Sequence, residues 1–140
     1  MQTTKDFKIV MVIDEALPLG LIANTAAVLA LSLGKEVKDF IGEDLTDKEG
    51  IVHAGLTGQP VPILKKNTDG LRELKKKSLQ YKDDLFTVDV TDVAQKSKEY
   101  ADYKEKLKDK TLDELTFLGI AFAGPTKLVT SLTGNLRLLR

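Results

Sequence analysis

Polar side chains that could do chemistry stand where two apolar runs of strand length end. Asp14 follows FKIVMVI (residues 7–13), while Asp89 and Thr91 stand at the end of LFTVDV (residues 85–90) and just after it. Ligands of open α/β sheets collect where strands end and loops begin, and a carboxylate in such a place can act as a general base. We therefore predict Asp89 as a catalytic residue, and Asp14 and Thr91 as ligand-binding residues.

Asn24 and Thr25 are a second candidate position, because they are polar residues inside the apolar run LIANTAAVLALSLG (residues 21–34). In one interpretation Asn24 is the N-cap of a helix, where its side chain accepts a backbone N–H bond that contributes about 1 kcal/mol. In the other, Asn24 acts in catalysis and Thr25 binds ligand at a helix start, whose dipole favours an anionic or carbonyl oxygen. The sequence leaves both interpretations open.

The third candidate position is the break at Gly124-Pro125, after the apolar run TFLGIAF (residues 116–122). Glycine accepts unusual dihedrals and proline is pre-set for a first helical turn, so the pair can end a strand and start a helix. A ligand-binding role is the alternative: the break exposes N–H groups of the next turn, and Lys127 adds a positive charge. We then expect the starts of the first and last helices to line one cleft.

The remaining candidates have simpler interpretations. Asp92 and Gln95 have the spacing of a reciprocal helix cap. His53 is the only histidine and follows a turn-rich segment, and the chain has no cysteine, so we expect no metal site built from protein ligands. Neither a Gly-x-Ser-x-Gly elbow nor a phosphate-binding or dinucleotide glycine motif occurs. We therefore predict no cofactor and no serine nucleophile.

The elements that must position these residues alternate along the chain. Beyond the three strands named above, we predict strands at residues 37–42 and 51–53 that pair as a hairpin, and place QPVPIL at a sheet edge because of its two prolines. Helices are predicted at residues 21–34, 67–79 and 91–115 and after Pro125, the first apolar nearly all round and therefore covered by other elements. This order predicts a single α/β domain over residues 1–140, with helices around a mixed sheet.

Composition limits the classes of partner. The 140 residues are 42% hydrophobic and 30% charged, with 21 basic and 21 acidic side chains. A net charge of zero gives no long-range attraction for nucleic acid or for an acidic membrane, and no signal-peptide pattern precedes the first strand. We expect a cytoplasmic protein with a small-molecule or carbonyl substrate, neither nucleic acid nor membrane as a partner, and a homodimer formed through exposed edges or apolar helix faces.

Two stretches resemble a known family. TFLGIAFAGPTKLVTSLTGNLRLL is similar to the ending of the archaeal and eukaryotic (type 2) peptidyl-tRNA hydrolases, and KIVMVIDEALPLGLIANTAAVLALSLG looks like their opening strand, Gly-bearing loop and Ala-Ala helix. Over nearly its full length, including QPVPIL, VDVTDVAQ and LTGNLRLLR, the chain more closely resembles an uncharacterised group, domain of unknown function 2000. The resemblance implies the hydrolase's fold, a three-layer α/β sandwich with a mixed sheet.

One departure from the hydrolase pattern bears on activity. That family has a Gly-Lys-Gly-Lys run that meets the peptidyl-tRNA, whereas the matching run here, GLIAN (residues 20–24), carries no positive charge. Electrostatic help for a phosphate or a developing oxyanion is therefore absent there, and the family's aspartate has only an approximate counterpart in Asp89 or Asp92. We predict either a hydrolase or transferase acting on a carbonyl substrate, with peptidyl-tRNA disfavoured by the missing lysine, or a non-catalytic module that binds a small ligand or a partner.

Overall fold

The computed structural model of the chain describes residues 6–140. Its strands are β1 (Phe7–Asp14), β2 (Leu45–Thr46), β3 (Val52–His53), β4 (Ile63–Lys66), β5 (Phe86–Thr91) and β6 (Phe117–Pro125). Its helices are α1 (Leu19–Val37), α2 (Thr68–Ser78), α3 (Asp92–Lys96), α4 (Tyr100–Lys108) and α5 (Thr126–Thr133), with 3-10 turns η1 (Lys38–Phe40), η2 (Leu79–Tyr81) and η3 (Leu112–Glu114).

Four strands form one mixed sheet in the order β4-β1-β6-β5. β1 pairs in parallel with β4 and antiparallel with β6, and β6 pairs antiparallel with β5. β1, β4 and β5 therefore end at the same side of the sheet, where β6 begins; we call this side the carboxyl edge. The two central strands are apolar almost throughout, as strands covered on both faces must be.

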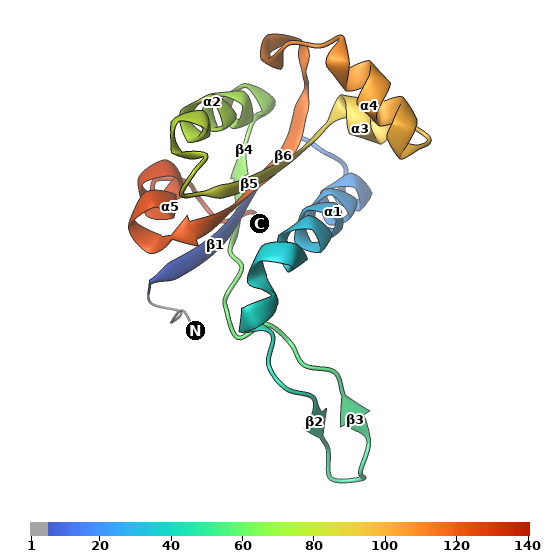
Figure 1. Cartoon of the computed structure of the whole chain (residues 1–140), viewed down its shortest axis with the longest axis vertical. Coiled ribbons are helices and arrows are strands. Elements are labelled where there is room, and N and C mark those ends of the chain that lie inside the picture. Colours follow the sequence, from blue (N-terminus) through green and yellow to red (C-terminus); the bar gives the residue numbers. More distant parts are fainter. Residues whose placement is uncertain (1–5) are drawn as a thin grey trace.

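Helices lie on both faces of this sheet and give three layers (Figure 1). One core joins α2 and α5 to Val10, Val12, Ile120 and Phe122, and the other joins α1 to Ile9, Met11, Ile13 and Ala121. These alternating positions of β1 and β6 follow the two-residue period of a strand. The structure confirms the predicted α/β class and mixed sheet, and places β4 at a sheet edge as its prolines indicate.

α1 is covered on one side only, so the prediction that it is buried all round is wrong. Thr25, Leu29, Leu33 and Val37 face the sheet, whereas Leu31 remains 81% exposed. The segment Leu19–Phe40 is long and apolar enough to cross a membrane, with a hydropathy of 1.2, yet only 22% of it is buried. One such helix is weak evidence for a membrane span, because core helices and signal sequences have the same composition.

Two other predictions fail in the middle of the chain. Residues 37–42 form the end of α1 and η1 rather than a strand, and β3 pairs instead with β2, inside the segment predicted to be a loop. The predicted helix over residues 91–115 is divided into α3, α4 and η3. Ser97 ends α3 because its backbone is extended, and its hydroxyl donates to Val93 O at 2.6 Å.

Residues 41–58 project from the body as a two-stranded arm, which we call the β2–β3 arm (Figure 1). Its base is closed by Gly42 N donating to Leu56 O and Gly58 N donating to Phe40 O, both at 2.8 Å. Gly55 permits the closest approach, because a Cβ there would lie 1.8 Å from Gly42 O. Local backbone contacts therefore hold the arm in shape without cover from the rest of the described chain.

Candidate functional site

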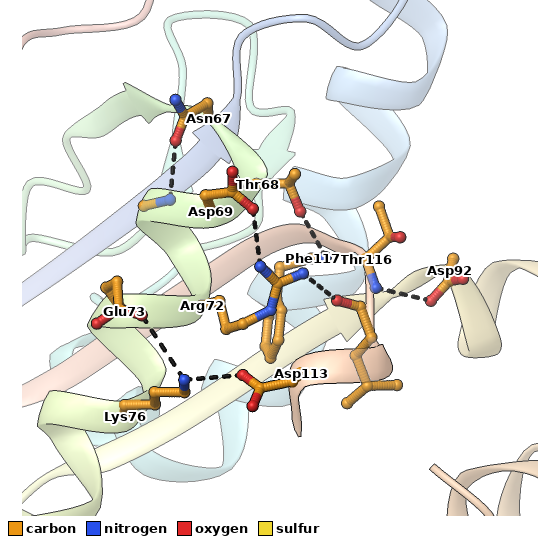
Figure 2. Close-up of polar contacts among 12 residues, drawn as sticks. Asn67, Thr68, Asp69, Arg72, Glu73, Lys76, Asp92, Asp113, Thr116 and Phe117 are labelled. Carbon is orange, nitrogen blue, oxygen red and sulfur yellow. Dashed lines mark hydrogen bonds and ion pairs between the residues drawn. The ribbon is translucent and has the colours of Figure 1, made fainter. Parts of the chain in front are cut away.

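The carboxyl edge carries a network of polar groups that bind one another (Figure 2). Asn67 caps α2 by accepting from Gly70 N at 2.8 Å, and Thr68 Oγ1 accepts from Phe117 N at 2.8 Å. Asp92 Oδ1 accepts from Thr116 N at 3.1 Å. These groups attach the starts of α2 and α3 to the start of β6, so their role is structural.

Asp92 and Gln95 do not form the predicted reciprocal cap. The helix α3 has Thr91 as its N-cap with no side-chain cap bond, and the Asp92 carboxylate is used across the sheet edge instead. Thr91 itself is 1% exposed and its Oγ1 has no hydrogen-bond partner in the described part of the chain. Thr91 is thus enclosed in the fold and does not line a cleft of the described residues.

A pair of ionic contacts on α2 extends this network (Figure 2). Arg72 donates to Leu115 O at 2.7 Å and pairs with Asp69 at 2.8 Å, while Lys76 Nζ lies 2.8 Å from Asp113. The Lys76 ammonium lowers the pKa of Asp113, and the Asp113 carboxylate raises the pKa of Lys76. Both side chains are largely exposed, so water screens their attraction.

The predicted cleft between the first and last helix starts is not present. Asp14 ends β1 at the carboxyl edge, whereas Gly124 pairs with Lys8 and Pro125 with Phe7 at the opposite end of the same strand. Eight residues of strand separate the two places by about 25 Å. Because β6 runs antiparallel to β1, α1 and α5 must start at opposite edges of the sheet.

Asn24 and Thr25 do not lie at a helix start, which both interpretations assumed. The helix α1 begins at Leu19 with Pro18 as its N-cap, so Asn24 is not a cap but an exposed residue within the helix. Thr25 is 2% exposed and packs on β6: a Cβ on Gly119 would lie 2.7 Å from Thr25 Cγ2. Thr25 therefore contributes to the contact between α1 and the sheet.

Gly124 and Pro125 form the junction between the end of β6 and the start of α5. Gly124 is a close-packing position, because a Cβ there would lie 3.1 Å from Leu85 Cδ1 and 3.2 Å from Asp84 O. Pro125 is the N-cap of α5, and Lys127 is exposed. The structural interpretation of this break accounts for Gly124 and Pro125.

Asp89 is the predicted residue that does line a cleft. It pairs with Lys75 Nζ at 2.9 Å, and the two side chains are only 20% and 21% exposed. Lys75 lies on α2 and turns toward the sheet. A half-buried ion pair of this kind is screened much less than a surface pair.

The cleft around Asp89, which we call the β5 cleft, has a volume of about 380 Å³ and follows the outer edge of β5. Its walls come from α1 on one side and from α3, α4 and the turn between them on the other. It is lined by Val28, Ser32, Val88, Asp89, Val90, Ala94, Ser97, Lys98, Glu99, Tyr100 and Tyr103. This volume lies in the range typical of small-molecule sites.

Tyr103 is the lining residue that sequence reasoning missed as a functional candidate. Burial, the Asp89 charge and Tyr100 together raise the pKa of Tyr103 above 10.0, so its hydroxyl is protonated at neutral pH and can donate a hydrogen bond. Tyr100 packs edge-on against it, with ring centroids 5.7 Å apart. The signal in the sequence was the pair of tyrosines three residues apart, which places both rings on one side of a helix.

His53 lies far from this cleft, on the β2–β3 arm. Its Nε2 is 2.8 Å from Asp47 Oδ2, which with the N–H groups of Ile51 and Glu49 lowers the pKa of Asp47. Asp47 thus fixes the turn of the arm. Among residues 6–140 there is no group of three or more metal-ligating side chains.

The chain was compared with known proteins. The family model described as "Protein of unknown function (DUF2000)" matches residues 7–140, and no curated protein matches the chain. A solved structure of a protein of unknown function from Agrobacterium tumefaciens is 22% identical, with a TM-score of 0.86 over 95% of this chain and 97% of that one. The resemblance to peptidyl-tRNA hydrolase stays a prediction that neither result confirms. The chain belongs to the DUF2000 family.

Proposed function

We propose that the protein is a binding module that holds a short extended peptide, or another small ligand with an amide group, in the β5 cleft. The observation that carries this proposal is the floor of the cleft. β5 is the last strand in the sheet order and pairs only with β6 within residues 6–140. Its outer N–H and C=O groups therefore face the cleft, and an extended chain can add to such an edge as a further strand.

The walls of the cleft supply the side-chain contacts that such a ligand needs. Val28, Val90 and the ring of Tyr100 offer apolar surface. The Asp89 carboxylate is an acceptor and the protonated Tyr103 hydroxyl is a donor, which matches the one N–H and one C=O of an amide. A mostly apolar pocket with a few polar groups is the usual form of a small-ligand site.

Binding without turnover is favoured because the cleft lacks an activated nucleophile. Asp89 is engaged by Lys75 at 2.9 Å, and the raised pKa of Tyr103 makes it a donor rather than a base. The two serines of the lining, Ser32 and Ser97, have no histidine among the other lining residues, and Ser97 donates to Val93 O. Covalent catalysis requires a base within hydrogen-bond reach of the nucleophile.

A hydrolase or transferase acting on an ester, amide or related carbonyl stays the alternative. One observation supports it: Asn24 is one helical turn before Val28, on the side of α1 that borders the cleft. Turnover of an ester or amide that is lost in Asn24→Ala and Asp89→Ala would establish this alternative. Peptidyl-tRNA belongs in the same substrate panel.

The test is a binding titration, by NMR chemical shifts, with N-acetyl dipeptide methylamides and with matched esters in which an ester oxygen replaces one N–H. We expect shifts at Val88, Val90 and Tyr103, and weaker binding of the esters because a donor is missing. Tyr103→Phe should weaken amide binding about 3- to 10-fold, the contribution of one neutral hydrogen bond.

Tyr81→Phe is the matched control, since Tyr81 belongs to η2 and does not line the cleft. Product analysis on the same samples separates binding from turnover. Equal binding of amides and esters, or an equal effect of both tyrosine substitutions, would contradict the proposal.

A further inference from the structure

The β2–β3 arm and the outer face of α1 leave two apolar surfaces without cover in the described chain. On the arm, Leu45, Ile51, Val52 and Leu56 are 63%, 55%, 62% and 83% exposed. An isolated two-stranded hairpin is marginally stable in water, and a long apolar arm is an aggregation risk unless something packs on it. Backbone hydrogen bonds at its base and turn shape this arm before any partner binds, which lowers the cost of ordering it.

The exposed apolar residues of α1 form one ridge. Leu19, Ala23, Ala27 and Leu31 follow one another at four-residue spacing, and all four are exposed, Leu19 and Leu31 at 81% each. Such a row is the ridge that packs into the groove of another helix. Alanine in the middle and leucine at the ends allow a second helix to approach closely at the centre and to be held at both sides.

The two surfaces belong to neighbouring segments, because the arm leaves the body directly after α1 and η1 (Figure 1). Together the arm and the ridge of α1 are of the size that a stable interface needs, roughly 20–30 residues a side. Most soluble oligomers are symmetric dimers in which the same surface is used on both subunits. A second copy of this chain brings both an arm and a ridge, so it can cover both surfaces at once.

Charges indicate how the second copy is oriented. The arm as a whole holds Glu43, Asp44, Asp47 and Glu49 against Lys48, a net charge of −3, with Asp47 and Glu49 at its tip. A groove of about 320 Å³ at the carboxyl edge is lined by Lys65, Lys66 and Arg137 against Glu15, a net charge of +2. This groove adjoins the start of α1, since Glu15 N donates to Lys66 O at 3.1 Å.

We infer that the protein forms a two-fold symmetric homodimer in which two α1 helices pack antiparallel at Ala23 and Ala27 and each acidic arm lies on the basic groove of the second copy. In this arrangement the arm that leaves the C-terminal end of one α1 passes the N-terminal end of the other. About eight residues of extended chain from Phe40 to the tip span roughly 26 Å, which sets the reach of the arm. The inference is independent of the ligand proposed for the β5 cleft.

The first test is sedimentation velocity of the full chain at micromolar concentration. We expect a dimer, and we expect Leu31→Glu to raise its dissociation constant about 30-fold or more, because a charge replaces one of the two large apolar side chains of the ridge. Leu79→Glu is the matched control, because Leu79 is also exposed, at 48%, but lies on η2 outside both surfaces. Circular dichroism melting of each variant shows that the fold is retained.

The second test uses the absence of native cysteine. Ala27→Cys, close to the proposed two-fold axis, should form an intermolecular disulfide under mild oxidation, since that bond requires Cα atoms about 4.4–6.8 Å apart. Leu79→Cys should remain monomeric on a non-reducing gel. Failure of Ala23→Cys and Ala27→Cys alike to cross-link would exclude the antiparallel α1 contact.

The third test exchanges charges. Lys66→Glu and Glu49→Lys should each weaken the dimer, and the double variant should recover much of the loss, because it restores an attraction across the interface. A wild-type monomer at micromolar concentration, or a dimer unaffected by Leu31→Glu, would overturn the inference. A monomer whose α1 face binds phospholipid vesicles would overturn it in favour of a membrane surface.

Discussion

Lys75 and Lys76 are neighbours on α2, yet they belong to regions of different character. Lys76 joins the exposed part of the carboxyl-edge network through Asp113, and Lys75 pairs with Asp89 beside the β5 cleft at nearly the same distance, 2.8 and 2.9 Å. The side chains of the first pair are 41% and 74% exposed, and those of the second 21% and 20%. The two ion pairs have nearly the same distance, but solvent screens the exposed Lys76–Asp113 pair far more. The attraction between Lys75 and Asp89 is therefore the stronger of the two.

The two regions also differ in whether their hydrogen-bonding groups are already satisfied within the fold. At the carboxyl edge the groups of Asn67, Thr68 and Asp92 accept from backbone N–H groups of the fold itself. Around the β5 cleft the strand edge has no partner on its outer side within residues 6–140. A satisfied network stabilises a fold, whereas unused hydrogen-bonding groups in a cleft are available to a ligand.

The largest expected effect is at the carboxyl edge, with Thr68→Val. This change keeps the shape of the side chain but removes the acceptor of Phe117 N–H, and Phe117 is 1% exposed. An unsatisfied buried donor should lower the free energy of unfolding by about 1–3 kcal/mol, as measured by urea denaturation. Thr68→Ser retains the hydroxyl and should recover most of the loss; ligand binding at the β5 cleft should be unchanged in both variants.

The two lysines provide the second prediction. Lys75→Met leaves the Asp89 carboxylate half-buried without its cation and should cost about 1 kcal/mol, less than a fully buried pair because one fifth of each side chain meets water. Lys76→Met should cause no resolvable change. Added salt should reduce the effect at Lys75 little, because burial limits screening. Equal losses from the two substitutions would show that burial does not distinguish the regions.

Much of the body of the fold could be predicted from sequence. Apolar runs of strand length predicted β1, β5 and β6, and the helix predicted at residues 67–79 corresponds to α2. The failures lie where a tertiary contact, rather than local propensity, decides. Residues 37–42 have strand-like composition, yet among the described residues their β-pairing is limited to the isolated Ile41–Thr57 bridge. α1 stays half exposed because no other described element covers its outer face.

The candidate site was less predictable, for a reason of topology. Residues from one strand end can be grouped only when the direction of each strand is known, and the antiparallel pairing of β1 with β6 placed Asp14 and Gly124 at opposite edges. Asn24 and Thr25 were ambiguous because the N-cap was Pro18, six residues before Asn24, the first polar side chain of the helix. Asp89 does lie beside a cleft. Its ion-pair partner Lys75 lies on α2, and no local sequence pattern indicates that these two residues are in contact.

The smallest expected effect is a titration that reports the environment of the cleft directly. Burial, Asp89 and Tyr100 raise the pKa of Tyr103 above its ordinary value of 10.0, so the fold favours the neutral phenol. The sign follows from linkage: this contribution to stability is fully present below pH 10, and is lost as the pH rises through the higher pKa of the folded state.

The chain has three tyrosines, so the absorbance change that Tyr103→Phe removes near 295 nm identifies this residue. Asp89→Asn should shift that change toward lower pH by removing the neighbouring negative charge, whereas Asp113→Asn, which alters the pair of the adjacent lysine outside the cleft, should leave it in place. If the removed phenol titrates at or below its ordinary value, the β5 cleft is as open to solvent as the network at the carboxyl edge, and the contrast between the two regions fails.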